Sequence, residues 1–145
     1  MKSHNDFMQV AIEEASKADK DVPVAALIVK NGEIISLAHN KKELLNDVTA
    51  HAEILAIKDA EKKQNNWRLE DCIMYVTLEP CPMCATAIVN SRIKEVYFGA
   101  YDNLYGALGS KMNMPAILNS DLKVKGGICE EACSLLLKNF WRKNG

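Results

Sequence analysis

The sequence predicts a three-layer α/β/α domain in which helices cover both faces of a five-stranded mixed sheet. Apolar runs of strand length alternate along the chain with segments whose apolar residues recur at helical spacing. Strands separated by helices in this way favour a largely parallel sheet that is covered on both faces. Asn31-Gly32 between the first two strand-like runs indicates a tight hairpin and therefore one antiparallel pair.

The first part of the chain contains one helix and the hairpin. Residues 5–18 carry apolar side chains at helical spacing, which predicts an N-terminal helix. Residues 24–29 form a continuous apolar run, and residues 33–38 form the return strand after the Asn31-Gly32 turn. We therefore expect the chain to enter the sheet through this hairpin.

The remaining elements continue the alternation. Residues 50–63 show the helical period, and Asp47 or Thr49 is available to cap the start of that helix. A strand, a helix, a strand, a weaker strand and a terminal helix are then predicted at residues 72–78, 83–90, 95–99, 122–124 and 130–141. No repeat, low-complexity tract or linker interrupts the chain, so we predict a single domain over residues 1–145.

Composition limits the class of protein. The N-terminal residues are charged throughout and no run of 18 apolar residues occurs, which predicts a cytoplasmic protein with no membrane association. The net charge of −1 argues against a protein whose affinity rests on a broad basic surface. In a reducing compartment, five cysteines indicate metal ligation or burial, because disulfides are rare there and the number is odd.

Two short motifs carry the metal chemistry, and each lies at the start of a predicted helix. His51 and Glu53 form a His-x-Glu motif, and Cys81 and Cys84 follow Pro80 in a Pro-Cys-x-x-Cys motif. A Cys-x-x-Cys turn can place two sulfurs on one ion, and zinc accepts thiolates and an imidazole together. His51, Cys81 and Cys84 are therefore the predicted ligands of one Zn²⁺ ion per subunit.

The number of ligands and the adjacent acid predict the chemistry. Three protein ligands leave one tetrahedral position for water, which distinguishes a catalytic zinc from a closed structural one. Zinc lowers the pKa of a bound water to about 7 and so makes it a usable nucleophile. Glu53 is not needed in the zinc shell, so we predict that it is the catalytic residue that moves protons from the water to a ring nitrogen and to the departing ammonia.

Each motif has an ordinary alternative when it is taken alone. A lone His-x-Glu is common by chance, and a lone Cys-x-x-Cys is a metal or redox site in a minority of cases. Together, with 26 residues between Glu53 and Pro80, they form the signature of zinc nucleobase deaminases. Cys72 is expected to be a buried strand residue, and Cys129 and Cys133 are spaced to share a face of the terminal helix.

The segments HAEILA, VTLEPCPMC and SRIKEVYFGA resemble the bacterial tRNA-specific adenosine deaminases of the cytidine deaminase superfamily. The resemblance extends from about Asp21 to the terminal helix, and His51, Glu53, Cys81 and Cys84 match the family's metal and proton-transfer positions. It implies a cytidine-deaminase-like fold and a hydrolase that converts adenosine to inosine at the wobble position of a tRNA anticodon loop. It also implies a homodimer with its active site near the subunit boundary.

The resemblance further implies substrate contacts. In the family, the residue matching Asn40 contacts the target nucleotide, the backbone at Ala52 contacts the base edge, and the loop containing Asp102 touches neighbouring nucleotides. By residue type alone, Asn40 could equally be a turn residue and Asp102 a local cap. A base in an anticodon stem-loop is already partly unstacked, so a compact protein can extrude it without a large basic surface.

The terminal helix supplies candidate RNA contacts in Phe140, Trp141 and Arg142, because aromatic rings stack on bases and arginine neutralises phosphates. An ordinary amphipathic helix end is the equal alternative. Two other functions remain open: a deaminase of a free base or nucleotide such as guanine or deoxycytidylate, and a non-catalytic zinc-stabilised partner subunit. Residues 99–110 favour the anticodon loop over the first, and Glu53 favours an enzyme over the second.

Overall fold

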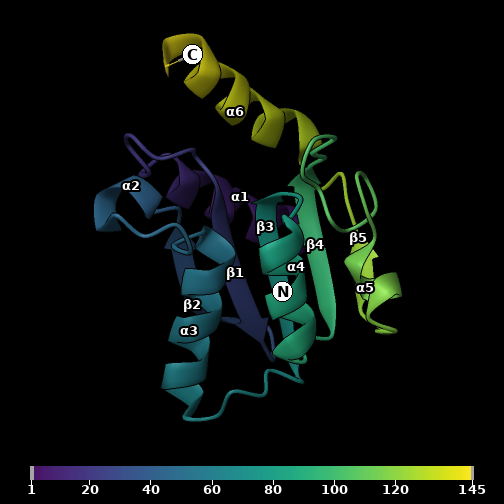
Figure 1. The fold of residues 1–145 in the computed structure, drawn as a ribbon. Coiled ribbons are helices and arrows are strands. Elements are labelled where there is room, and N and C mark those ends of the chain that lie inside the picture. The colour runs from purple at the N-terminus through teal and green to yellow at the C-terminus, as the bar shows by residue number, and fades with distance from the viewer. Residues whose placement is uncertain (1, 145) are drawn as a thin grey trace.

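A computed structural model describes residues 2–144, and the end residues 1 and 145 of the predicted domain lie outside that range (Figure 1). The strands are β1 (Ala25–Lys30), β2 (Glu33–His39), β3 (Cys72–Leu78), β4 (Glu95–Ala100) and β5 (Lys123–Lys125). The helices are α1 (His4–Ala15), α2 (Lys42–Leu45), α3 (Ala52–Gln64), α4 (Pro82–Asn90), α5 (Met114–Ile117) and α6 (Glu130–Asn144). The five strands form one sheet between two helical layers, which confirms the predicted α/β/α class.

The sheet has the strand order β2-β1-β3-β4-β5 and is half parallel and half antiparallel. The predicted hairpin is confirmed, since Asn31 and Gly32 have φ values of 51° and 78° and join the antiparallel strands β1 and β2. β3–β4 and β4–β5 are parallel, but β1 also pairs antiparallel with β3. The prediction of a largely parallel sheet with one antiparallel pair is therefore wrong, because no local pattern reveals the long-range β1–β3 pairing.

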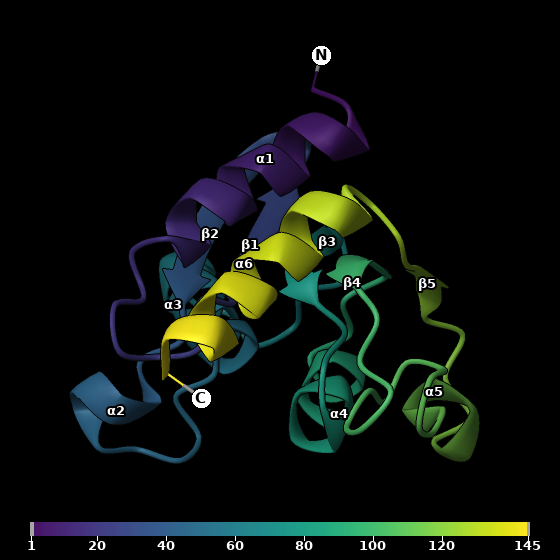
Figure 2. The ribbon, with the colours of Figure 1, turned by 90° about the horizontal axis from the view of Figure 1, so that it is seen from above.

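Figure 2 shows α1 and α6 on one face of the sheet and α3, α4 and α5 on the other. Neighbouring residues of β1 therefore face different cores: Leu27 lies in the core with Met8 of α1, and Ile28 lies in the core with Ile57 of α3. Leu27 and Ile28 are both fully buried. A strand covered on both faces needs apolar side chains at successive positions, and each burial of this kind contributes about 1.5–3 kcal/mol.

The start of α3 differs from the prediction in a way that matters for the site. α3 begins at Ala52, and His51 is its N-cap residue with no side-chain capping bond. Asp47 instead accepts hydrogen bonds from the backbone N–H and the hydroxyl of Thr49. The predicted cap is therefore wrong, and the His51 imidazole is free to serve elsewhere. The one-turn helices α2 and α5 were not predicted, because four residues show no helical period.

The strands β2, β3 and β4 finish at the same end of the sheet, and α3 and α4 begin there (Figure 1). The loops that follow these strands carry Asn40, Glu79 and Asp102. Chain segments distant in sequence therefore converge at one end of the sheet, where α/β proteins usually bind ligands. No helix within residues 2–144 has the length and apolar character needed to span a bilayer.

Candidate active site

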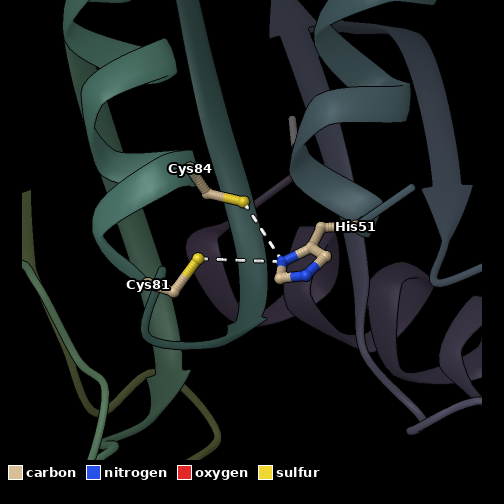
Figure 3. A group of neighbouring side chains, drawn as sticks. All are labelled: His51, Cys81 and Cys84. Atoms are coloured by element: carbon tan, nitrogen blue, oxygen red, sulfur yellow. Dashed lines mark hydrogen bonds between the residues drawn. The ribbon is translucent and has the colours of Figure 1, made fainter. Parts of the chain in front are cut away.

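Three metal-binding side chains meet between the starts of α3 and α4, as Figure 3 shows. His51 and Cys81 are the N-cap residues of these helices, and Cys84 lies in the first turn of α4. The His51 Nδ1 atom lies 3.7 Å from the Cys81 Sγ atom and 3.5 Å from the Cys84 Sγ atom. The structure thus brings together the three side chains that the sequence predicts as zinc ligands.

The spacing of these atoms fits a tetrahedral zinc ion. Zn–S bonds of about 2.3 Å and Zn–N bonds of about 2.0 Å at tetrahedral angles place nitrogen and sulfur about 3.5 Å apart. The observed distances of 3.5 and 3.7 Å agree with this arrangement. Among residues 2–144 the group has no fourth His, Cys, Asp or Glu member, so a zinc ion held by it would keep one position for water, as catalytic zinc sites do.

The Cys81 sulfur is placed to carry negative charge. A hydrogen bond from the Cys84 thiol, together with the His51 imidazole, lowers the pKa of Cys81 to about 4 even though burial opposes this shift. The contact with Cys81 in turn raises the pKa of His51 and of Cys84. Both sulfurs lie at the N-terminus of α4, where the helix dipole favours negative charge. A thiolate ligand is therefore favoured before any cation binds.

Glu53 lies in the first turn of α3 and is only 4% exposed. Burial raises the pKa of its carboxyl group to about 7. A carboxyl group that titrates near neutral pH can both accept and release a proton, as a general acid–base residue must. Glu53 lines the same cavity as His51 and Cys81, so the predicted proton-transfer residue lies beside the predicted metal ligands.

The cavity beside the metal-binding group has a volume of about 390 Å³, which is within the usual range for small-molecule sites. Asn40, Asp102 and Trp141 line it, although they come from three separate parts of the chain. Ala52 is fully buried and is not part of the lining. Two of the three residues predicted to bind substrate, and one of the candidate RNA contacts, therefore line one cavity.

Phe140 and Arg142 flank Trp141 on α6 but do not line the cavity. The ring of Phe140 packs edge-on against the ring of Trp141, with 5.0 Å between centroids. Arg142 is exposed to solvent. Of the three candidate RNA contacts on this helix, only Trp141 reaches the cavity directly.

Asn40 and Asp102 both make the local hydrogen bonds that their residue types suggested. The Asn40 side chain accepts from the backbone N–H of Ala52 and donates to the carbonyl of Val22. The Asp102 carboxylate accepts from the backbone N–H groups two and three residues further along the chain. Asn40 and Asp102 therefore each stabilise the local backbone and also line the cavity.

Two buried carboxylates at the cavity were not predicted from the sequence. Asp21 and Glu79 are 5% and 2% exposed, and both line the cavity. Asp21 accepts hydrogen bonds from the N–H groups of Glu43 and Leu44 at the start of α2. Glu79 accepts from the segment after β4. For Glu79 the sequence did hold a signal, because an acidic residue directly follows the apolar run of β3. A carboxylate buried at that point needs hydrogen-bond donors, which predicts contacts with another segment.

The other three cysteines take no part in the metal-binding group. Cys72 and Cys133 are buried, as expected. Burial raises the pKa of Cys133 to about 12, which keeps it a neutral packed thiol. Cys129 is half-buried and precedes α6, so the prediction that it shares a helix face with Cys133 is wrong.

Known proteins are similar to this chain in sequence and in fold. The family model of the cytidine and deoxycytidylate deaminase zinc-binding region matches residues 1–100. The tRNA-specific adenosine deaminase of Aquifex aeolicus (strain VF5) is 50% identical over 141 residues, which cover 94% of this chain and 93% of the relative. A solved structure from work on A-to-I editing by tRNA:A34 deaminases at the wobble position of transfer RNA is 37% identical, with a TM-score of 0.82 over 90% of this chain and 98% of that chain.

The solved guanine deaminase of Bacillus subtilis is 41% identical, but that similarity covers only 69% of this chain and 66% of the other, with a TM-score of 0.67. The similarity to tRNA-specific deaminases is more extensive, because it covers nearly the whole chain. The matched family region also contains His51, Glu53, Cys81 and Cys84. The chain therefore belongs to the cytidine and deoxycytidylate deaminase family of zinc-dependent hydrolases and, within it, to the bacterial tRNA-specific adenosine deaminases.

Proposed function

We propose that this enzyme converts adenosine to inosine at the wobble position of a tRNA anticodon loop. The observation that carries the proposal is the placement of His51, Cys81 and Cys84 next to the buried carboxyl group of Glu53 in one cavity. The names of the relatives supply the substrate, since the similar proteins that cover nearly the whole chain are tRNA-specific adenosine deaminases.

The metal ligands of the proposed reaction are the His51 Nδ1 atom and the sulfurs of Cys81 and Cys84. Zinc bound by them supplies Lewis acidity, which lowers the pKa of water to about 7. Because the Cys81 thiol is readily ionised in this site, the protein offers a negatively charged ligand at neutral pH.

Glu53 moves the protons of the reaction. Its carboxylate accepts a proton from the attacking water and gives it to N1 of the purine while a bond forms between C6 and the water oxygen. It then transfers a second proton from that oxygen to the amino group, so the C6–N bond breaks and ammonia leaves. The burial of Glu53 keeps bulk water away from the carboxyl group during these transfers.

The cavity walls provide contacts for both the base and the flanking RNA. Val24 and Leu78 offer apolar surface to the faces of a base, and Asn40 offers a polar group to its edge. Tyr105 and Trp141 are 67% and 55% exposed and line the same cavity, so they can stack on the nucleotides beside the target.

The remaining predicted contacts lie around this cavity. We assign Phe140 the role of orienting Trp141 through their edge-on contact, and Arg142 the role of binding a phosphate. Ala52 is fully buried and its backbone N–H donates to Asn40, so we assign it no direct contact with the base; it holds the Asn40 side chain at the cavity wall. These contacts require no broad basic surface, which agrees with the net charge of −1.

The decisive experiment compares RNA with small substrates. Purified enzyme is incubated with an anticodon stem-loop that carries a wobble adenosine, and separately with guanine, cytidine and deoxycytidylate, and the released ammonia is measured. We expect ammonia and inosine from the stem-loop only. Ammonia from the small molecules alone would reject the tRNA assignment and favour a free-base or nucleotide deaminase.

We also propose that the enzyme is a homodimer and acts in the cytoplasm, where tRNA is its substrate. Leu44, Val48, Leu104 and Ile117 are each more than 60% exposed, at 71%, 72%, 73% and 63%, and a second subunit would remove such apolar surface from water. Sedimentation analysis should give a mass twice the 16.1 kDa of one chain. A mass of one chain at micromolar concentration would reject a stable dimer.

A further inference from the structure

The Glu79 side chain is the centre of a hydrogen-bond cluster at the edge of the cavity. Its Oε1 atom accepts from the Asp102 N–H at 3.1 Å and from the Ser110 hydroxyl at 2.5 Å. Its Oε2 atom accepts from the N–H groups of Leu108 and Ser110 at 3.1 and 3.0 Å. All four donors belong to the segment 102–110, which follows β4.

The segment packs directly onto this carboxylate. A Cβ atom at Gly106 would lie 2.4 Å from the Glu79 Cδ atom, so only glycine permits the close approach. The adjoining backbone makes the same connection, because the Ala107 N–H donates to the Pro80 carbonyl at 2.8 Å. Glu79 and Pro80, directly after β3, therefore both hold the segment 102–110 in place.

Within the described part of the chain, the Glu79 carboxylate forms no ion pair with a lysine, arginine or histidine, although the residue is only 2% exposed. Its charge is compensated by N–H and O–H donors alone, and such a site is satisfied only while the segment keeps its conformation. The carboxylate and the conformation of the segment are thus coupled.

The segment carries residues that line the cavity. Asp102 and Tyr105 line the cavity together with Glu79, whereas Leu108 and Ser110 serve as its donors. Glu79 also lies two residues before Cys81, so the same short stretch of chain supplies a predicted metal ligand and the anchor of this wall.

We propose that Glu79 is a positioning residue for RNA: its carboxylate holds the segment 102–110 so that Asp102 and Tyr105 face the nucleotides next to the target base. This inference rests on the proposed function for its substrate. It predicts an effect on RNA binding that is separate from proton transfer by Glu53.

The test uses Glu79→Gln, which keeps the size of the side chain but directs an amide N–H₂ group at N–H donors. We expect KM for the anticodon stem-loop to rise by at least about tenfold, which corresponds to the loss of one good contact, while kcat at saturation and the zinc content stay close to those of the wild type. Hydrogen exchange should become faster at the amides of Asp102, Leu108 and Ser110. Glu33→Gln is the matched control, because Glu33 is exposed at the turn of the hairpin. It should change neither KM nor the hydrogen exchange of these amides.

Ser110→Ala removes the hydroxyl donor and leaves the Glu79 carboxylate in place. It tests the role of this cluster in RNA binding even if Glu79→Gln does not fold. We expect a smaller rise in KM with unchanged kcat. Unchanged KM in both variants, or a fall in kcat without a change in KM, would overturn the inference. If the wild type does not act on the stem-loop, the proposed function fails, whereas the exchange comparison still shows whether Glu79 holds the segment.

Discussion

The Asn40 Oδ1 atom accepts a hydrogen bond of 2.7 Å from the backbone N–H of Ala52. This bond joins the end of β2 to the first residue of α3, and it satisfies one of the N–H groups that a helix start leaves without an intrahelical partner. Ala52 lies between His51 and Glu53, so Asn40 fixes the backbone from which both side chains extend into the site.

We predict that Asn40→Ala lowers both stability and turnover. Loss of the Asn40 acceptor leaves the buried Ala52 N–H without a partner, which costs about 1–3 kcal/mol, and the backbone beside Glu53 becomes less well fixed. Urea unfolding and stem-loop deamination measure the two effects. Asn90→Ala, at the exposed end of α4, is the control and should be near neutral. Equal stability of the two variants would contradict this role of Asn40.

Glu53→Gln should fold and bind zinc but lose turnover. Glutamine has nearly the same shape but cannot accept and release a proton, and general acid–base catalysis is worth about 10²–10⁴ in rate. The measurements are the deamination rate on the stem-loop, metal content by mass spectrometry and the melting temperature. Retention of wild-type turnover would exclude Glu53 from proton transfer and revive the alternative of a zinc-stabilised module.

Removal of zinc should abolish activity, and its return should restore it. Cys81→Ser should lower both zinc content and turnover, because serine offers a poor ligand to zinc where the structure holds a readily ionised thiol. Cys129→Ser is the matched control, since that residue lies outside the metal-binding group. Full zinc content in Cys81→Ser would show that the metal is held elsewhere.

Glu14 should make stability depend on pH in acid. Burial raises the pKa of this carboxyl group, but hydrogen bonds from His39 and Lys17 outweigh burial and leave the pKa lowered. A lowered pKa in the folded state means that this stability is present above the unfolded-state pKa and is lost as the pH falls through the folded-state pKa.

Urea unfolding near neutral pH and below about pH 4 tests this statement. Glu14→Gln should be less stable than the wild type near neutral pH, and the difference should shrink in acid. Glu13→Gln, an exposed neighbour, should show no such change. A difference that stays constant across the range would mean that Glu14 contributes by packing instead of by charge.

The metal-binding group could be predicted from the sequence because its signal is local. The chain itself fixes the spacing of Cys81 and Cys84 and places Glu53 two residues after His51, so the sheet needed only to bring the two motifs together. The five strands and the four longer helices were also predictable from local patterns, namely short apolar runs for strands and apolar residues at helical spacing for helices, and their bounds differ from the predictions by only a few residues.

What escaped prediction depends on contacts between distant segments. The β1–β3 pairing and the anchoring of residues 102–110 by Glu79 join parts of the chain that carry no common pattern. Asp21 is similar, because its partners at the start of α2 belong to a turn too short to show a period. The sequence offers Asp47 or Thr49 as the cap of α3, because residue type cannot distinguish a helix cap from the local turn in which Asp47 accepts from Thr49.

His51 and Cys81 each occupy the first position before a helix, on two helices anchored to the same sheet face. Their arrangement is therefore inherited from the scaffold and does not have to be created by the ion. A preparation stripped of metal should keep its shape and accept zinc again without being unfolded. Zinc binding should then need no refolding, and its rate should depend on access to the cavity and on the concentration of the ion.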